Sequence, residues 1–360
     1  MAVTTTSVIA GPVNVVFQVN LLRNAKALCP YFKGSTPAEI SFRQGTFSAR
    51  WRRIENLTPT TTPLAEITGS LAFPTRSAVQ PTVTDLDATV AKYGNFFFLN
   101  EEVDLVNFNG QAAKLSEVLG INAGRSLNRL QRNVIEDNAT AIFAGTGTTA
   151  TSISTATGGI TLSDIAVGVN ALNRNDAMRF MPMSRGEAAD GTAPIRSAYW
   201  GFCHVDVEED VRLLTGFQGI ETYAGQTETA QGEFGTVGGV RFISTSEATI
   251  DADSGATITG TATSNSRSTS NTSADVYNTV ILGMDAVGSL GFGNSHIQES
   301  YTAGDRLPAV MMVGHERGSA GAADPLNEVS SVGWKSWHAG RILNSTWVRV
   351  IQHSASKLEL

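Results

Sequence analysis

The segment GQAAKLSEVLGINAGRSLNRLQRNVIEDNATAIFA, residues 110–144, carries the strongest structural signal in the chain. Its apolar residues recur at three- and four-residue steps, the spacing of one face of an amphipathic helix. No proline interrupts the segment, so we expect one helix from Gly110 to Ala144, about 50 Å long at 1.5 Å per residue. A helix of this length would form the spine of a domain, and Gly145 and Gly147 would end it. The apolar stripe consists of Leu115, Leu119, Ala123, Leu127, Leu130, Val134, Ile142 and Phe143.

Two strand-like stretches precede the helix and flank a proline-rich tract. Residues 40–57 alternate in character, and residues 82–99 are rich in β-branched and aromatic side chains, with Gly94 as a bulge or bend. Four prolines between them exclude a helix or a central strand. We therefore expect an extended hairpin with a long tip. The prolines are Pro59, Pro63, Pro74 and Pro81.

Other segments of the chain flank the hairpin and the long helix. A Thr-rich arm with a short helix at residues 19–28 precedes the hairpin. After the long helix, Thr161 and Asp164 form a capping box that predicts a helix through Leu172. Residues 247–275 contain no aromatic residue and no lysine, so we expect an exposed insertion or a mobile loop. Further strands are expected at residues 197–205, 275–283, 308–315, 332–343 and 345–351, and a helix at residues 206–214.

Composition excludes several classes of protein. The 360 residues are 41% hydrophobic and only 16% charged, against roughly 25% charged in an average domain. The net charge of −7 argues against a dedicated nucleic-acid binder. No apolar run approaches the ~20 residues of a membrane span. The first positive charge is Arg23, so the N-terminus lacks the basic start of a secretory signal, and we expect synthesis in the cytoplasm.

No motif points to catalysis, a cofactor or a metal. Cys29 and Cys203 are expected to be free, buried thiols, and the histidines lack the spacing of a zinc site. Cys203 and His204 would point to opposite faces of a strand, which argues against a nucleophile pair. GTGTTA at residues 145–150 matches a dinucleotide pattern in letters but follows the expected helix, so we interpret it as a helix stop.

Carboxylates are numerous but not paired by spacing. The acidic residues at 206–210 fit the start of a helix better than a cation site. Asp251 and Asp253 are a weaker alternative for calcium. A glycosidase would need two carboxylates across a scissile bond, and no such pair is marked in the sequence. We therefore expect no catalytic residues.

The order of parts resembles the major capsid proteins of tailed bacteriophages with the Hong Kong 97-type fold, and more closely their podovirus-type subfamily. The resemblance rests on AKYGNFFFLNEEVDL (91–105), GEFGTVGGVRFISTS (232–246) and DPLNEVSSVGWKSWHAGRILNSTWVRVI (324–351), with VYNTVILGMDAVG (276–288) in support. It implies an α+β fold with an N-terminal arm, an extended E-loop hairpin, a spine helix, and peripheral and axial domains. The implied divisions are 1–39 (arm), 40–100 (E-loop hairpin), 101–158 (peripheral domain with the spine helix), 159–300 (axial domain with the 247–275 insertion) and 301–360 (returning strands).

The resemblance also implies a function. Subunits would form hexamers and pentamers that close an icosahedral shell around double-stranded DNA, without sequence-specific binding, and the protein would be located in the virion. A separate scaffolding protein and a portal would be partners, and a decoration protein remains open. Between Lys33 and Lys92 the chain has no lysine, so we expect no isopeptide crosslink from the hairpin.

Four residues on the hairpin stem are candidates for contacts between subunits. Arg50, Trp51, Arg52 and Arg53 combine guanidinium groups with an aromatic ring, a composition that interfaces favour. The arginines would pair with carboxylates of a neighbour, while Trp51 has a second interpretation as a core residue. Two other proteins fit parts of this description: an encapsulin-type nanocompartment shell protein, and a Ser/Thr-rich surface-binding protein.

Overall fold

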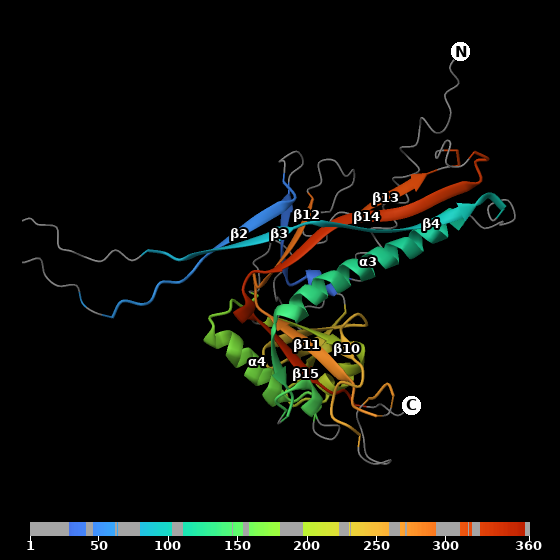
Figure 1. The fold of residues 1–360 in the computed structure, drawn as a ribbon. Coiled ribbons are helices and arrows are strands. Elements are labelled where there is room, and N and C mark those ends of the chain that lie inside the picture. The colour runs from blue at the N-terminus through green and yellow to red at the C-terminus, as the bar shows by residue number, and fades with distance from the viewer. Residues whose placement is uncertain are drawn as a thin grey trace, which may run out of the picture.

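A computed structural model gives the fold of the chain (Figure 1). The predicted helix at residues 19–28 and most of the proline-rich hairpin tip lie outside the residues that it describes. The described residues are 29–40, 46–61, 63, 80–102, 111–145, 147–153, 158–180, 197–222, 230, 232–258, 267–270, 272–292, 310–315, 317–318 and 325–356.

The fold is α+β, as expected, and contains a five-stranded sheet, an eight-stranded sheet and a two-stranded hairpin (Figure 1). The five-stranded sheet has the order β1-β12-β14-β13, and β4 pairs with β14 beside this path. β1 and β12 are parallel, whereas β14 is antiparallel to β12, β13 and β4. The strands are β1 (Ser35–Ile40), β4 (Ala91–Asn100), β12 (Val287–Phe292), β13 (Val310–His315) and β14 (Val329–Ile342).

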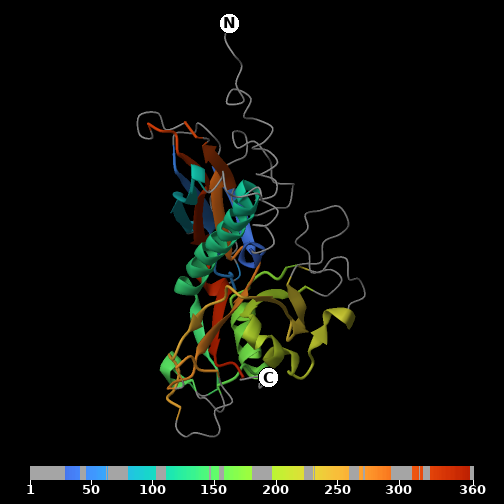
Figure 2. The same ribbon diagram turned by 90° about the vertical axis from the view of Figure 1, so that its right-hand side faces the viewer.

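Helix α3 (Gln111–Asn138) lies across one face of the five-stranded sheet (Figure 2). Its 28 residues span about 42 Å. Leu119, Ala123 and Leu127 are buried in a cluster with Trp334 of β14 and Val310 of β13, so the predicted apolar stripe does form the contact. The stripe also includes buried polar residues that the sequence did not mark: Asn128 accepts the Tyr31 N–H, and the Gln131 side chain donates to the Ser35 hydroxyl.

The helix is shorter than predicted, because it ends at Asn138 and not at Ala144. Residues Thr140–Phe143 form the strand β5, which pairs in parallel with β15 (Val348–His353). Ile142 and Phe143 continue the helical spacing by letter, yet their backbone hydrogen bonds go to a strand more than two hundred residues away. GTGTTA therefore follows a strand, and a short 3₁₀ helix, η2 (Ala150–Ser152), comes after it.

The eight-stranded sheet has apolar clusters on both faces. Tyr199, Cys203 and Phe242 belong to a cluster with α4 (Leu162–Arg174), whose cap is the predicted Thr161–Asp164 box. The other face carries a cluster that includes Trp200 and extends to α3. The order is β5-β15-β11-β6-β9-β8-β7, with β10 on β11. The further elements are β6 (Tyr199–His204), β7 (Gln218–Gly219), β8 (Glu233–Val237), β9 (Val240–Thr245), β10 (Ile250–Asp251), β11 (Val276–Leu282), α5 (Glu208–Arg212), and the 3₁₀ helices η1 (Pro30–Phe32), η3 (Val205–Val207), η4 (Ile220–Thr222) and η7 (Ser345–Trp347).

The hairpin projects from the body of the molecule (Figure 1). Its stem consists of β2 (Ser48–Ile54) and β3 (Val83–Thr89), which pair antiparallel as predicted. The predicted second strand, residues 82–99, is divided into two, because β4 leaves the hairpin after Val90 and pairs with β14. The paired stem is therefore shorter than the interval 40–100.

The segment 247–275 differs from the expected exposed loop at both of its described ends. Glu247, Ala248, Ala274 and Asp275 are buried, and β10 joins the eight-stranded sheet. The Asp275 carboxylate accepts backbone N–H groups of Asp253 and Thr269. Hydrogen bonds to Ser, Thr and Asp groups thus replace the apolar contacts that this sequence lacks. Residues 259–266 and Asn271 lie outside the described part.

Candidate subunit interface

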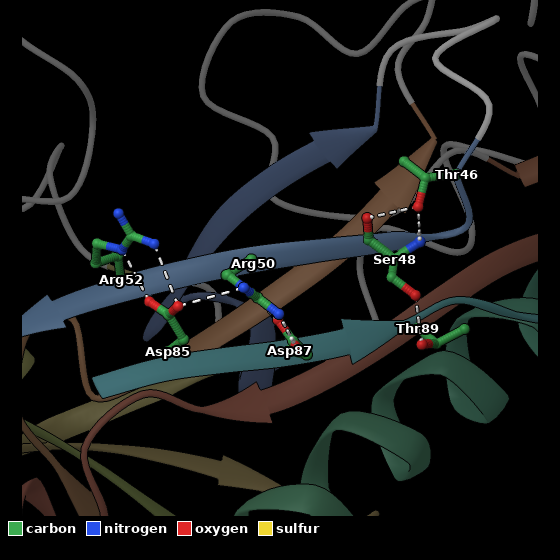
Figure 3. A network of polar contacts seen from close by, with 7 residues as sticks. All are labelled: Thr46, Ser48, Arg50, Arg52, Asp85, Asp87 and Thr89. Atoms are coloured by element: carbon green, nitrogen blue, oxygen red, sulfur yellow. Dashed lines mark hydrogen bonds and ion pairs between the residues drawn. The ribbon is translucent and has the colours of Figure 1, made fainter. Parts of the chain in front are cut away.

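The exposed face of the hairpin stem carries a ladder of charge pairs (Figure 3). The antiparallel register places Arg50 opposite Asp87 and Arg52 opposite Asp85, so each guanidinium meets a carboxylate across the strands. Arg50 binds Asp87 through two hydrogen bonds, Nε–Oδ1 at 2.6 Å and Nη2–Oδ2 at 2.8 Å. Arg52 binds both oxygens of Asp85, at 2.8 and 3.2 Å, and Arg50 reaches Asp85 at 3.3 Å.

These contacts fix the charge state of the ladder. The hydrogen bond from Arg50 lowers the pKa of Asp87, and the hydrogen bond from Arg52 lowers the pKa of Asp85. Hydrogen bonding to the ionised form favours that form, so both carboxyl groups are more acidic than an unpaired aspartic acid. The stem therefore presents alternating fixed charges to solvent. Further along the same face, the hydroxyls of Ser48 and Thr89 lie 2.7 Å apart (Figure 3).

Trp51 points to the opposite face of the stem and packs on the body of the molecule. It contacts a buried cluster that includes Ile40, Ala88 and Leu290. Its ring lies close to Gly288 of β12, where an added Cβ atom would come within 3.0 Å of the Trp51 Cζ2 atom. Gly288 therefore leaves space for the indole. The partly buried ring attaches the stem to the five-stranded sheet.

Arg53 lies on the same face as Trp51 and attaches the base of the stem to the body. Its guanidinium donates to the Glu55 carboxylate at 2.6 and 2.9 Å and to the Leu343 carbonyl at 2.9 Å. The hydrogen bond from Arg53 lowers the pKa of Glu55. An open groove of about 680 Å³ lies beside this anchor, and its lining includes Ile54, Met178 and Trp347.

The structure thus separates the four predicted contact residues. Arg50 and Arg52 face solvent, whereas Trp51 and Arg53 face the molecule's own body. All three arginines bind carboxylates of their own chain. Period-two alternation along a strand was visible in the sequence, but the partners Asp85 and Asp87 became apparent only with the register across the proline-rich tip.

The other chemically active side chains are held in structural roles. Both cysteines are buried thiols, as expected, and burial raises the pKa of the Cys29 thiol to about 12. Cys203 donates to the Ile243 carbonyl, while Nδ1 of His204 accepts from the Asp206 N–H. Asp253 accepts hydrogen bonds from Ser268 and Ser270. Among the described residues no cluster of three or more His, Cys, Asp or Glu side chains is placed to hold a metal ion.

Solved structures define the class of this fold. The capsid of Ralstonia phage GP4 matches with a TM-score of 0.61 at 10% identity, over 91% of this chain and 88% of that chain. The head structure of Helicobacter pylori bacteriophage KHP40 matches with a TM-score of 0.53 at 10% identity, over 92% and 91%. The mature capsid of bacteriophage PhiM1 matches with a TM-score of 0.51 at 13% identity, over 89% and 86%. The chain therefore has the Hong Kong 97-like capsid fold.

Sequence comparison identifies the family. The family model described as "Phage capsid protein" matches residues 83–348, and the chain belongs to this family. It is a structural capsid protein of a tailed bacteriophage, located in the virion capsid. No curated relative matches the chain. None of the described helices is long and apolar enough to span a membrane.

Proposed function

We propose that the chain assembles into hexamers and pentamers that close an icosahedral shell around the double-stranded DNA of the phage. The observation that supports this most is the match of the phage capsid family model across residues 83–348. In this proposal the five-stranded sheet with α3 forms the peripheral domain, and the eight-stranded sheet forms the axial domain around each capsomer axis. Closed rings of identical subunits require heterologous contacts, and the projecting hairpin supplies a surface for one of them.

The exposed face of the hairpin is the part that we assign to a neighbouring subunit. Arg50 and Arg52 keep more than half of their side-chain surface accessible while bound to Asp85 and Asp87. A neighbour meets a ladder of fixed, alternating charges, which favours specific alignment more than raw affinity. Trp51 and Arg53 hold the stem in place on its own subunit.

We also propose assembly partners for the subunit, and we propose no enzymatic activity for it. The subunit is made in the host cytoplasm and assembles with a separate scaffolding protein and a portal. We assign it no catalytic residue and no cofactor. Because no lysine lies between Lys33 and Lys92, mature particles should run as monomers on a denaturing gel. Bands above the monomer would contradict the absence of a crosslink.

The shell is proposed to enclose DNA without binding it tightly. A net charge of −7 per subunit gives weak repulsion of phosphate, which lets the genome slide during packaging. Empty particles should therefore show no steep salt dependence of duplex binding. A strongly salt-dependent affinity, the sign of counterion release from many phosphate contacts, would contradict this part of the proposal.

The first test is negative-stain microscopy with light scattering on the purified chain, alone and with the scaffolding protein of the same phage. Closed shells, or stable hexamers and pentamers, are the expected result. A chain that stays monomeric under both conditions would contradict the proposal. Particles filled with protein cargo and free of DNA in infected cells would favour the encapsulin-type alternative.

A further inference from the structure

An apolar patch is exposed on the five-stranded sheet. Phe96 and Phe98 are two residues apart on β4 and therefore share a face, and 59% and 70% of their surfaces are accessible. Scattered exposed apolar residues are ordinary, but neighbouring ones mark interaction sites. We call Phe96 and Phe98 the aromatic patch.

The molecule's own helix covers the opposite face of this part of the sheet. The register pairs Phe97 with Val332 and Asn95 with Trp334, and Val332 and Trp334 pack in the cluster with Leu119 of α3. Phe96 and Phe98 alternate with these residues, so they point away from α3. Nothing in the arrangement of α3 can therefore bury them.

The two rings of the aromatic patch are already packed against each other in the single subunit. The rings of Phe96 and Phe98 meet edge to face at 5.1 Å, an arrangement that aromatic pairs favour. Phe96 lies across Gly333 of β14, where an added Cβ would come within 2.7 Å of the Phe96 Cβ. A glycine here lowers the strand surface and lets the ring lie close to the backbone. The rings therefore need little ordering on contact with a partner.

The surroundings of the patch match those of a protein interface. Residues 93–100 contain no charged side chain, and Lys335, which pairs with Gly94 on the same face, has its ammonium group 5.6 Å from the centroid of the Trp337 ring. Beside them, Arg317 and Glu101 form an ion pair at 3.1 Å. An apolar centre with a polar rim is the usual anatomy of a contact between proteins. In addition, β4 pairs only with β14 among the described strands, which leaves a long apolar edge of the kind that proteins normally protect.

We propose that the aromatic patch is buried against a second copy of this chain in the assembled capsid. The inference rests on the proposed self-assembly, and it adds a contact surface separate from the hairpin stem. The chain belongs to a capsid family, so its own copies surround each subunit at the highest local concentration. β4 extends along the five-stranded sheet away from the eight-stranded sheet (Figure 1), and this end is available to a neighbour.

Thiol labelling of Phe98→Cys tests the contact directly. The natural cysteines are buried and their pKa values are raised, so they give little background reaction. Leu213→Cys is the matched control, since Leu213 is 76% accessible and lies in the eight-stranded region. Labelling rates are compared between free subunits and particles in which a small share of each cysteine variant is assembled together with an excess of the wild-type chain. We expect Phe98→Cys to slow at least about tenfold on assembly, clearly more than Leu213→Cys.

Each outcome separates the two proposals. No slowing at Phe98→Cys overturns the patch contact while leaving self-assembly intact. Protection that appears only when a second protein is added means that the occupant is not a copy of the chain. If the wild-type chain forms no particles, the proposed function itself fails.

A second variant measures the importance of the contact. Phe96→Ser with Phe98→Ser should lower particle yield at least about tenfold. Because both side chains are exposed, the midpoint of thermal unfolding of the free subunit should stay within a few degrees of the wild type. Normal particle yield from a double variant that folds would overturn the proposal.

Discussion

The eight-stranded sheet has buried clusters of its own chain on both faces, whereas the five-stranded sheet leaves Phe96 and Phe98 bare on the face opposite α3. All residues of β8 and β11 are buried. By contrast, β4 is mostly exposed along its ten residues. The eight-stranded sheet is covered by its own chain on both faces, whereas one face of the five-stranded sheet leaves the rings of Phe96 and Phe98 to a partner. A shell subunit needs a rigid, covered sheet as well as a sheet with exposed surface, because the rigid part must hold the contact surfaces in place.

An ion pair between an arginine and a carboxylate occurs both in the eight-stranded region and on the hairpin, with different consequences for stability. Arg241 and Glu233 form a bidentate ion pair in the eight-stranded region, and both side chains are fully buried. Arg50 and Asp87 form an equally short pair on the hairpin, and both are exposed. Removing one partner of the buried pair leaves the other charge buried without its counter-ion, whereas a charge left over from the exposed pair is hydrated by solvent. The comparison therefore predicts large effects on stability in one region and effects on assembly in the other.

The largest effect is expected from Arg241→Met. It leaves the buried Glu233 carboxylate without its guanidinium and should lower the free energy of unfolding by about 3–5 kcal/mol. Arg212→Met is the matched control, because Arg212 pairs with Glu208 at 2.7 Å on the partly exposed helix α5. The control should cost below about 1 kcal/mol. Urea unfolding of free subunits measures both.

A second change tests whether burial is the cause. Adding Glu233→Leu to Arg241→Met removes the stranded carboxylate and should recover a large part of the loss. Equal costs for the buried and the exposed arginine would show that the two regions do not differ as described.

Acid should weaken the five-stranded region through His338 of β14. Burial lowers the pKa of His338 to about 4, from an ordinary value of 6.5. A lowered folded-state pKa means that the unfolded chain binds the proton more readily, so stability is full above pH 6.5 and falls as the pH drops towards 4. The loss amounts to about 3 kcal/mol.

His338→Leu isolates this contribution from that of other titrating groups. The unfolding free energy of the wild type minus that of the variant should fall by the same amount between pH 6.5 and pH 4. Urea titrations at a series of pH values provide the measurement. A constant difference across this range would rule out His338 as the acid-sensitive group.

A smaller effect is expected where the hairpin joins the body. Trp51→Ala removes a half-buried indole from the cluster around Leu290 and should cost about 2 kcal/mol, less than a fully buried aromatic residue. Ile54→Ala, on the exposed face of the same strand with 65% of its surface accessible, should cost less than about 0.5 kcal/mol. Similar costs at both positions would contradict the packing of Trp51 on the body.

The smallest effect on stability is expected from Arg50→Asp, which places two carboxylates opposite each other on exposed strands. The midpoint of thermal unfolding should fall slightly, and the double variant Arg50→Asp with Asp87→Arg should restore it, because the reversed pair forms again. Particle yield should stay low in the double variant, since a neighbour then meets the opposite charge pattern. Recovery of particle yield together with stability would show that the charge ladder acts only within the subunit and not in contacts between subunits.

Local signals in the sequence predicted the elements whose stability is local. The Thr161–Asp164 capping box forms as expected, since both partners lie within one helical turn. The apolar stripe of α3 correctly located the contact of Leu119 and Leu127 with the sheet. The family resemblance, carried by the order of blocks from residue 91 to 351, led to the correct fold and family.

Long-range pairing accounts for what the sequence did not reveal. Ile142 and Phe143 fit the helical stripe, yet pairing with Ile351 and Gln352 makes them a strand. Glu247 belongs to a tract with few apolar residues, yet its carboxylate is buried between Arg125 and Arg129 of α3. In both cases the deciding partner is more than one hundred residues away. Spacing along the chain cannot supply such a register.

The most direct test of this account is hydrogen–deuterium exchange of free subunits and of assembled particles. We expect assembly to slow exchange in β4 and along the hairpin stem, the elements with surface left for neighbours. Exchange in β6 and β11 should already be slow in free subunits, because these strands lie inside the eight-stranded sheet. New protection confined to the eight-stranded region, with β4 and the hairpin unchanged, would contradict the account.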